Sequence, residues 1–336
     1  MSLGNNSKLF VDPSDVKEMK SIEVSIYADE SRSTELEMDF ADKENWMYIG
    51  ILIVPETIKE ALLDELKSNR CKNKNTWDKC PHFKCLYHDK NNKEVHFDKL
   101  ISKDDYYIAD RWIDFFMNDR AKTHFYILGI NTKEIDRSYF GALKGQDDTI
   151  YNRFFRTAIS KSLRYYFSDY DKIVVNHICH DNSDSLKTHE HFPWHSIFKI
   201  ENDISEDKLP ITFKCREITF VDSDHRISGS DESHFIQYID LLLGAVRLCF
   251  HGNVKNDNKN LIALKTIPIV KRIADESSWR NPNSRFCYHK RCSIDFFPKQ
   301  KLSAEDNFLY KESKRLNCFY KNRPILIDDD KQPRLF

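Results

Sequence analysis

The chain has 336 residues, of which 40% are hydrophobic and 31% are charged, and its formal net charge at pH 7 is −1. A chain of this length and apolar content can bury a full core, while its balanced charge gives no overall reason to expect an anionic partner. Glycine occurs only 8 times. Glycine-rich phosphate-binding loops are therefore not expected, and none of their motifs is present.

The sequence favours a cytoplasmic protein without a membrane partner. No apolar run approaches the roughly 20 residues that a membrane-spanning helix needs, and the first residues lack the pattern of a secretion signal. The 9 cysteines are therefore expected to be reduced thiols. Charge is uneven, because residues 271–336 contain fifteen Lys and Arg against nine Asp and Glu. This surplus is either a phosphate-facing patch or a solvated tail.

The first part of the chain predicts a strand pair followed by a helix. Residues 21–28 alternate in polarity and are β-branched, which is typical of a strand, and a second strand is predicted over residues 46–54. The connection between them is short, so an antiparallel pair is expected. A helix is predicted over about 58–68. Residues 69–92 then form a polar, irregular insertion that leads to a short extended segment at 93–97.

The middle of the chain alternates between helices and strands. Apolar residues at helical spacing predict three helices, over residues 103–118, 147–167 and 183–200. Apolar and β-branched runs predict three strands, over residues 124–131, 172–179 and 213–221. Two strands and a helix followed by this alternation predict an α/β fold with a mixed sheet flanked by helices.

Residues 233–247 predict a buried helix that carries one acid, Asp240. An ionised carboxylate on an apolar surface costs several kcal/mol unless a positive or hydrogen-bonding group meets it. Three interpretations follow. Asp240 is paired with Arg247, two turns later, or it caps a neighbouring loop, or it is a carboxylate of a metal site. Gly244, one turn after Asp240, allows close approach of another part of the backbone. A helix over about 261–274 completes the predicted elements.

Other acids lie just beyond predicted strands. Asp29 follows the first strand, Asp181 follows the strand at 172–179, and Asp222 and Asp224 follow the last one. The ends of adjacent parallel strands lie within about 5 Å of each other, so these side chains can converge. Clustered carboxylates repel one another unless a cation neutralises them, and Mg²⁺ prefers oxygen ligands. Two such ions can activate a water and stabilise the leaving oxygen in phosphodiester cleavage.

The residues from Tyr27 to Ser31 resemble the opening segment of a bacterial family catalogued as domain of unknown function 3800. Further segments are similar to that family's motifs and occur in the same order: Glu94-Val95-His96-Phe97, Asp181-Asn182, and Val221-Asp222-Ser223 followed by Ile236-Gln237-Tyr238-Ile239-Asp240 and Gly244. These matches extend from Ser21 to about Phe250. The resemblance implies a ribonuclease H-like domain over 18–255, which includes the insertion at 69–92. Residues 256–336 would be a helical and irregular extension packed on it.

The resemblance also implies a nuclease site for two Mg²⁺ or Mn²⁺ ions. Its expected catalytic and metal-binding residues are Asp29, bridging both ions, Glu94 and Asp181 at the first, and Asp240 at the second. Residues expected in supporting roles are Glu30, Ser31, His96, Asp222, Ser223 and Gln237. Of these, Gln237 would orient Asp240 or a phosphate, and His96 or His225 would move a proton or contact a phosphate.

The expected function is therefore hydrolysis of phosphodiester bonds in RNA or DNA, and a protein partner or homodimer is also left open. Two rival interpretations remain. One is a non-catalytic adaptor that binds nucleic acid or protein and uses the acids as hydrogen-bond anchors. The other is a phosphotransferase or phosphatase that applies the same metal chemistry to a small substrate.

The insertion at 69–92 carries a candidate zinc site. Structural zinc takes four nitrogen or sulfur ligands in a tetrahedral array, and the residues that could supply them are Cys71, Cys80, Cys85 and His88. The alternative is a set of reduced loop thiols. A loop this long with no apolar pattern needs something to hold it, which favours zinc. More distant partners could come from Cys287, His289 and Cys292.

The segment at 286–299 alternates aromatic and basic side chains. Its aromatic residues are Phe286, Tyr288, Phe296 and Phe297, and its basic residues are Lys290, Arg291 and Lys299. Such alternation matches a platform on which single-stranded bases stack. Most other aromatic residues fall on predicted core stripes and are expected to fill the core.

Overall fold

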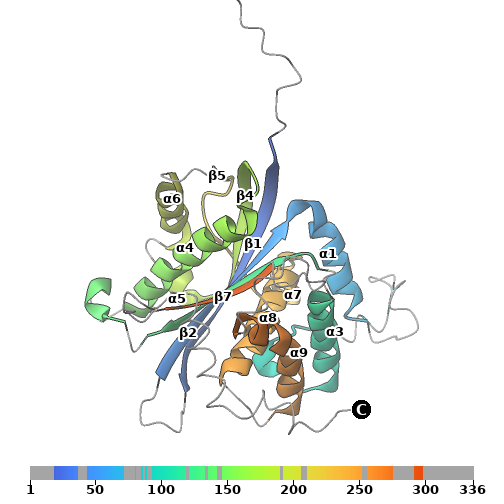
Figure 1. Ribbon diagram of the computed structural model, residues 1–336. Helices are drawn as coiled ribbons and strands as arrows, with labels where there is room; N and C mark the ends of the chain where they lie inside the picture. The colour runs from blue at the N-terminus through green and yellow to red at the C-terminus, as the bar shows by residue number, and fades with distance from the viewer. Residues whose placement is uncertain are drawn as a thin grey trace, which may run out of the picture.

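The chain folds around one mixed β-sheet with helices on both faces (Figure 1). This computed structural model describes residues 19–36, 44–71, 80, 85, 88, 93–118, 121–132, 135–141, 146–189, 192–205, 210–251, 256–274 and 291–297. Within them the sheet has seven strands: β1 (Ser21–Leu36), β2 (Glu44–Pro55), β3 (His124–Asn131), β4 (Lys172–Asp181), β5 (Ile211–Phe213), β6 (Thr219–Val221) and β7 (Cys292–Phe297).

The strands follow the order β5-β4-β1-β2-β3-β7, and β6 also pairs with β4 beyond the end of β5. Only β2 runs antiparallel to its neighbours, β1 and β3, while every other pair is parallel. The predicted antiparallel pairing of the first two strands is confirmed. The prediction of an α/β fold with a mixed sheet is confirmed as well.

Eight α-helices occur in the described ranges: α1 (Glu56–Ser68), α3 (Lys103–Met117), α4 (Gln146–Phe167), α5 (Asp184–Lys187), α6 (Phe192–Ser205), α7 (His225–Ser228), α8 (Glu232–His251) and α9 (Asp257–Ala274). Two short 3₁₀ helices lie in the connections: η4 (Phe97–Lys99) precedes α3, and η5 (Arg137–Phe140) precedes α4. None of these helices is both long enough and apolar enough to cross a bilayer.

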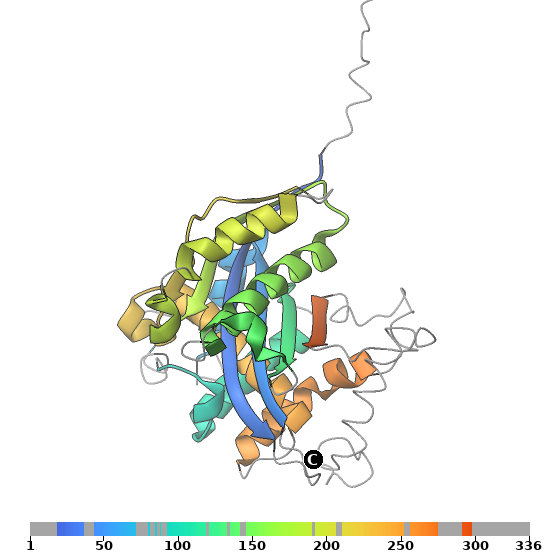
Figure 2. The ribbon, with the colours of Figure 1, turned by 90° about the vertical axis from the view of Figure 1, so that its left-hand side faces the viewer.

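The sheet separates two hydrophobic cores. Helices α4 and α6 cover one face, and α1, α3, α8 and α9 cover the other (Figures 1 and 2). Successive residues of a strand point to opposite faces, and β1 follows this rule. Ile26 and Ala28 lie in the core under α4, while Tyr27 between them lies in the core under α8. Asp29 and Ser31 are two and four residues after Tyr27, so they lie on the same face of the sheet as Tyr27, the face covered by α8.

Several predicted elements are more divided than expected. The helix predicted at 183–200 is two helices, α5 and α6, and α6 has Pro193 in its first turn, where proline is tolerated. The strand predicted at 213–221 is split into β5 and β6. Its intervening Ile218 donates its N–H to the carbonyl of Pro193 at 2.7 Å instead of to a neighbouring strand. The segment at 93–97, predicted to be extended, is extended at His96 but is not part of the sheet, and η4 begins at Phe97.

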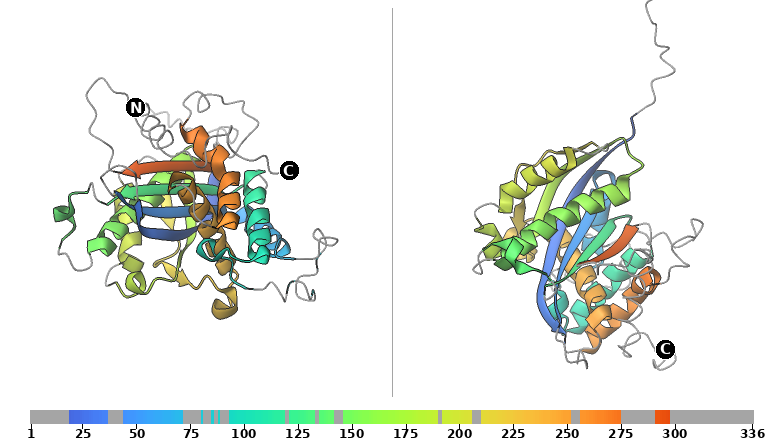
Figure 3. Two further views of the ribbon diagram at one scale, coloured as in Figure 1. Left: turned by 90° about the horizontal axis from the view of Figure 1, so that it is seen from below. Right: turned by 60° about the vertical axis from the view of Figure 1, so that its left-hand side comes forward.

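Strand β7 was not predicted. It pairs in parallel with β3 (Figure 3, left), and its Asp295 accepts hydrogen bonds from Tyr126 at 2.6 Å and Lys161 at 2.8 Å. Helix α9 packs against α8 and α3. The described part of 256–336 therefore contributes an edge strand and a core helix rather than surface alone.

Candidate functional site

Asp29 lies inside a strand rather than at its exit, because β1 continues to Leu36. The parallel partner β4 pairs with β1 only as far as His180, opposite Ala28, and ends at Asp181. Asp29 and Asp181 therefore come next to each other in the sheet at the point where β4 stops. The prediction that both acids lie at the exits of adjacent strands is correct for Asp181 and wrong for Asp29.

Helix α8 brings Asp240 to the same place from the face of the sheet. Its carboxylate accepts the backbone N–H of Phe97 at 2.6 Å and lies 3.6 Å from Nδ1 of His96. Gly244, one turn later, makes this approach feasible. A Cβ at that position would lie only 2.3 Å from Cγ of Phe97.

These groups line a cavity of about 250 Å³, which we call the acidic cavity. It is lined by five acids, one Arg and one His, together with smaller and apolar residues: Asp29, Glu30, Ser31, His96, Phe97, Asp98, Asp181, Asn182, Asp240, Leu243, Gly244 and Arg247. Three of the four predicted catalytic acids, Asp29, Asp181 and Asp240, are thus brought together from three elements.

Burial and mutual repulsion favour the protonated form of these acids. Burial raises the pKa of Asp29 well above its ordinary value, and the carboxylates of Asp240 and Asp181 raise it further. Burial also raises the pKa of Asp181 to about 7. The pKa of Asp240 is raised by burial as well, against the opposing effect of His96 and the Phe97 amide. A cation in the cavity would relieve this cost.

Glu94 does not join these acids. Its carboxylate accepts hydrogen bonds from Oγ of Ser223 at 2.6 Å and Nζ of Lys99 at 2.9 Å, and it is not among the residues that line the acidic cavity. Burial alone would raise its pKa, but these two hydrogen bonds, together with the charges of Lys99 and His96, outweigh burial and leave the pKa lowered. Glu94 is therefore an ionised partner of Lys99 beside the cavity, and its predicted place at the first metal is not supported.

Gln237 is buried, and its side chain hydrogen-bonds to the backbone just after Glu94 and not to Asp240. Its Oε1 accepts the N–H of Val95 at 3.0 Å and a hydrogen bond from the guanidinium of Arg70. Its Nε2 donates to the carbonyl of Ser223. Gln237 thus fixes the path of the segment that carries His96 and Phe97 into the cavity.

Arg247 does not form the alternative ion pair with Asp240. Its guanidinium donates to Oγ of Ser31 and, at 3.2 Å, to Asp98. Asp98 is a cavity residue that sequence reasoning missed, because the short 3₁₀ turn of η4 has no periodic pattern. Its position directly after the matched Glu94–Phe97 segment was the available signal. Glu30 lines the cavity from the opposite side and lies 3.4 Å from Nε2 of the buried His180.

The remaining predicted residues make local contacts near the cavity but do not line it. Asp222 accepts the N–H of Asp224 at 2.9 Å, and Asp224 begins α7 and pairs with Arg226. His225 packs against the ring of His234, with their centroids 4.7 Å apart. Burial lowers the pKa of His225 to about 4, so it is neutral at pH 7 and is a poor phosphate ligand.

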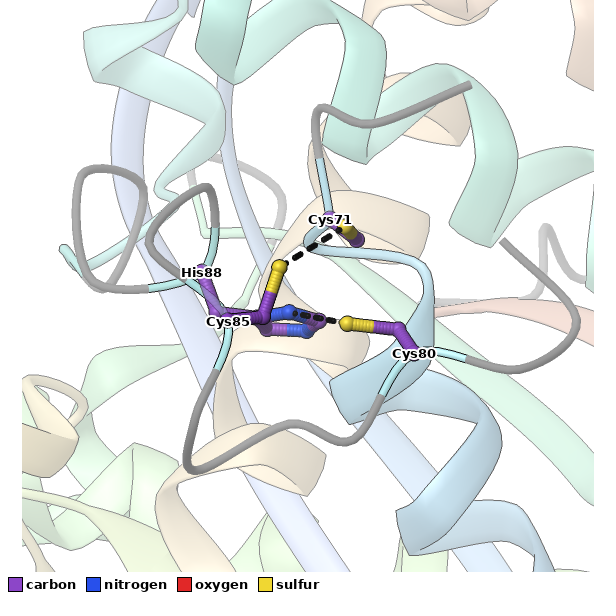
Figure 4. Close-up of side chains that lie close together, drawn as sticks. All are labelled: Cys71, Cys80, Cys85 and His88. Carbon is purple, nitrogen blue, oxygen red and sulfur yellow. Dashed lines mark hydrogen bonds between the residues drawn. The ribbon is translucent and has the colours of Figure 1, made fainter. Parts of the chain in front are cut away.

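A second candidate site lies beyond the end of α1. Cys71, Cys80, Cys85 and His88, here called the Cys3His group, are all buried, and their ligand atoms lie within 4.8 Å of one another (Figure 4). Among the described residues, this is the one set of three or more His, Cys, Asp or Glu side chains that comes so close. The oxygens of the acidic cavity are less tightly gathered. The Cys3His group could hold a metal such as zinc.

Cys292, one of the more distant residues that could have completed the zinc site, does not belong to the Cys3His group. It lies in β7 and is buried in the core. Cys287 and His289 lie outside the described residues, as do most of the aromatic and basic residues at 286–299. Within that segment, Arg291 is buried, which argues against its role on an exposed stacking platform.

No protein-family model matches the sequence, and no curated protein matches it. The resemblance to the domain-of-unknown-function 3800 family therefore stays a prediction that depends on the motifs themselves.

Proposed function

We propose that this chain is a divalent-metal-dependent nuclease with a ribonuclease H-like fold. The strand order β3-β2-β1-β4-β5, in which only β2 is antiparallel, supports the fold assignment. Fold does not determine function, so the proposal of activity depends on the acidic cavity.

The observation that carries the proposal is the convergence of Asp29, Asp181 and Asp240 in one cavity with raised pKa values. A structural role would not require three acids to be gathered at this cost without a buried basic partner for each. An all-oxygen set of carboxylates fits Mg²⁺ or Mn²⁺ rather than a softer ion. When bound, such ions activate a water and stabilise the leaving oxygen of a phosphodiester.

The protein's own groups would hold this set in place. Asp29 is fixed by β1 and accepts the N–H of Glu30 at 2.8 Å, and Asp240 is fixed by the Phe97 amide. His96, beside Asp240, is placed to hold or release a proton near the scissile bond. Arg247 and Lys259 meet Asp98 at the cavity edge, at 3.2 and 3.3 Å. They offer positive charge to a phosphate backbone.

The test is cleavage of RNA and DNA by the full chain with Mn²⁺. Asp29→Asn and Asp240→Asn are each expected to lower the cleavage rate by 100-fold or more, roughly the effect of losing one strong transition-state contact. Asp184→Asn, which changes an exposed acid at the start of α5, serves as the matched control and should cleave normally. Equal rates for all four proteins, including the wild type, would show that the activity comes from elsewhere.

One observation favours the rival function, a non-catalytic adaptor. Because the cavity acids have raised pKa values, they can stay protonated and donate hydrogen bonds to a bound partner. An adaptor would bind nucleic acid or protein equally well with and without Mn²⁺. Titration with Mn²⁺ therefore separates the two functions, because only the metal site should bind the ion and lose it in Asp29→Asn.

A further inference from the structure

We propose that the Cys3His group binds one structural Zn²⁺ and that this ion fixes the wall of the acidic cavity through Arg70 and Gln237. Zinc binding itself does not depend on the nuclease proposal. Only its consequence for cleavage does.

The ligand atoms of the group are as close together as one zinc ion requires. Sγ of Cys71 lies 3.7 Å from Sγ of Cys85, and two thiolates on one zinc, each at about 2.3 Å, lie about 3.8 Å apart. Sγ of Cys80 lies 2.9 Å from Nδ1 of His88, so this pair would separate by roughly half an ångström on binding. None of the seven cysteines that the structure describes is in a disulfide.

The tautomer of His88 is the one that a metal ligand needs. Its Nε2 lies 2.6 Å from the backbone carbonyl of Lys67. A carbonyl can only accept, so Nε2 carries the hydrogen, and Nδ1 presents its lone pair to the three sulfurs. Metal-bound histidines commonly donate their other ring N–H to a backbone carbonyl in this way. The Lys67 carbonyl belongs to the last turn of α1 and also accepts the N–H of Arg70 at 3.1 Å.

The group is connected to the acidic cavity by a short series of hydrogen bonds. Arg70 directly precedes the ligand Cys71, and its guanidinium donates to the carbonyl of Lys93 at 2.8 Å and to Gln237. Gln237 also holds the N–H of Val95. Two residues later, Phe97 donates its N–H to Asp240.

Zinc would therefore fix the segment at 93–97 from both sides. It would hold Cys71 and thus Arg70, which binds the segment from the end of α1. It would also hold His88, a few residues before Lys93 in the chain. Without the ion, Cys71 and His88 would lose this common anchor, so His96 and Phe97 would be held less firmly beside Asp240.

The first measurement is the zinc content of the purified full chain by elemental mass spectrometry. The wild type should carry about one zinc per chain, and Cys80→Ser and His88→Ala should lose most of it. His88→Cys should retain zinc, because a fourth thiolate is an equally good ligand. Cys215→Ser is the matched control, a half-buried cysteine in the β5–β6 connection, and should also retain it.

Wild type that takes up no zinc after reduction and reconstitution would overturn the proposal. So would a protein purified under reducing conditions in which Cys71 and Cys85 are joined by a disulfide. Because a ligand variant can simply fail to fold, wild-type protein stripped of zinc and then reconstituted provides an independent comparison. Replacing zinc with Co²⁺ should give the visible absorption of a tetrahedral thiolate site, and the absence of these bands would contradict the assignment.

The second measurement is amide hydrogen exchange of the segment at 93–98, with no substrate present. Removing zinc should speed exchange at Val95 and Phe97 by about tenfold or more, since their acceptors lose their fixed position, and restoring zinc should reverse this. Unchanged exchange at these amides would refute the connection to the cavity. Neither measurement uses cleavage, so a failure of the nuclease proposal would leave both results intact and interpretable.

Discussion

A carboxylate that is buried among other carboxylates is costly to ionise, and Asp29 and Asp181 illustrate this cost. Their raised pKa values mean that the folded protein binds protons near neutral pH that the unfolded chain would release. The stability of the folded state should consequently depend on pH in a direction that can be worked out from these values.

Asp181 gives the clearest prediction. Its ordinary pKa is 3.8 and burial raises it to about 7 in the folded state. The folded state therefore holds the proton more tightly, and the free energy of unfolding should fall as pH rises from about 4 to about 7. Asp181→Asn removes this loss. At pH 8, without added Mg²⁺ or Mn²⁺, the variant should be more stable by roughly 1–4 kcal/mol.

The measurement is denaturant unfolding of both proteins at several pH values. The two stabilities should converge near pH 4 and separate as the pH rises, and saturating Mn²⁺ should stabilise the wild type more than the variant. If the two stability curves stay parallel across this range, the Asp181 carboxyl does not titrate as its surroundings indicate.

The sequence was sufficient to locate those acids whose position follows from the helix or strand that carries them. Asp240 was identifiable because it is the one acid on an apolar helix face, and Asp181 because it follows an apolar strand. The contacts that Glu94 and Gln237 make in the structure were not predicted. Their partners, Lys99, Ser223 and Arg70, depend on the path of an irregular segment, which no periodic pattern encodes.

The contact between η4 and α8 sets how closely the backbone of Phe97 approaches Asp240. A Cβ at Gly244 would lie 2.3–2.6 Å from three atoms of Phe97, one of which is the Cβ of Phe97. Contacts that short cannot be relieved by rotating the ring alone, so the start of η4 would have to move. The glycine is therefore required by close approach and not by backbone conformation.

Gly244→Ala should destabilise the fold by about 1–3 kcal/mol, the usual cost of overpacking, even though Ala favours a helix by up to about 1 kcal/mol. It should also weaken Mn²⁺ binding, because displacement of Phe97 removes the N–H that orients Asp240. Thermal unfolding and Mn²⁺ titration measure the two effects.

Gly50→Ala is the matched control, because Gly50 lies opposite Asp29 on β2. Its added Cβ would meet the ends of Ile239 and Leu243 at 3.2 Å, and these flexible side chains can yield. A loss of stability in Gly50→Ala as large as in Gly244→Ala would show that the contact with Phe97 is not the cause of the destabilisation.

Elements with a clear pattern were predicted to within a few residues. Helices α3 and α4 and strand β3 have the expected apolar spacing, and their bounds agree with the prediction. Strand β7 was missed because its pairing with β3 is a contact between residues about 170 positions apart, which local patterns do not reveal. The split between β5 and β6 depends similarly on the contact of Ile218 with Pro193.

For the molecule as a whole, the sheet determines where chemistry can occur. It is covered by helices on both faces (Figure 3, right), and Asp29 on β1 comes opposite the end of β4. Helix α8 crosses the face beside this position and supplies Asp240. The α/β class was predictable from the alternation of elements. The approach of α8 was not, because it depends on how the two cores pack.

The most direct test of the proposed metal site is a crystal structure of the full chain soaked in Mn²⁺, with the ion located by its anomalous scattering. We expect an anomalous peak inside the acidic cavity, within about 2.5 Å of carboxylate oxygens from Asp29 and from at least one of Asp181 and Asp240. The peak should be absent in Asp29→Asn. A cavity that holds no Mn²⁺ at saturating concentration, with these three carboxylates still apart, would contradict the central claim.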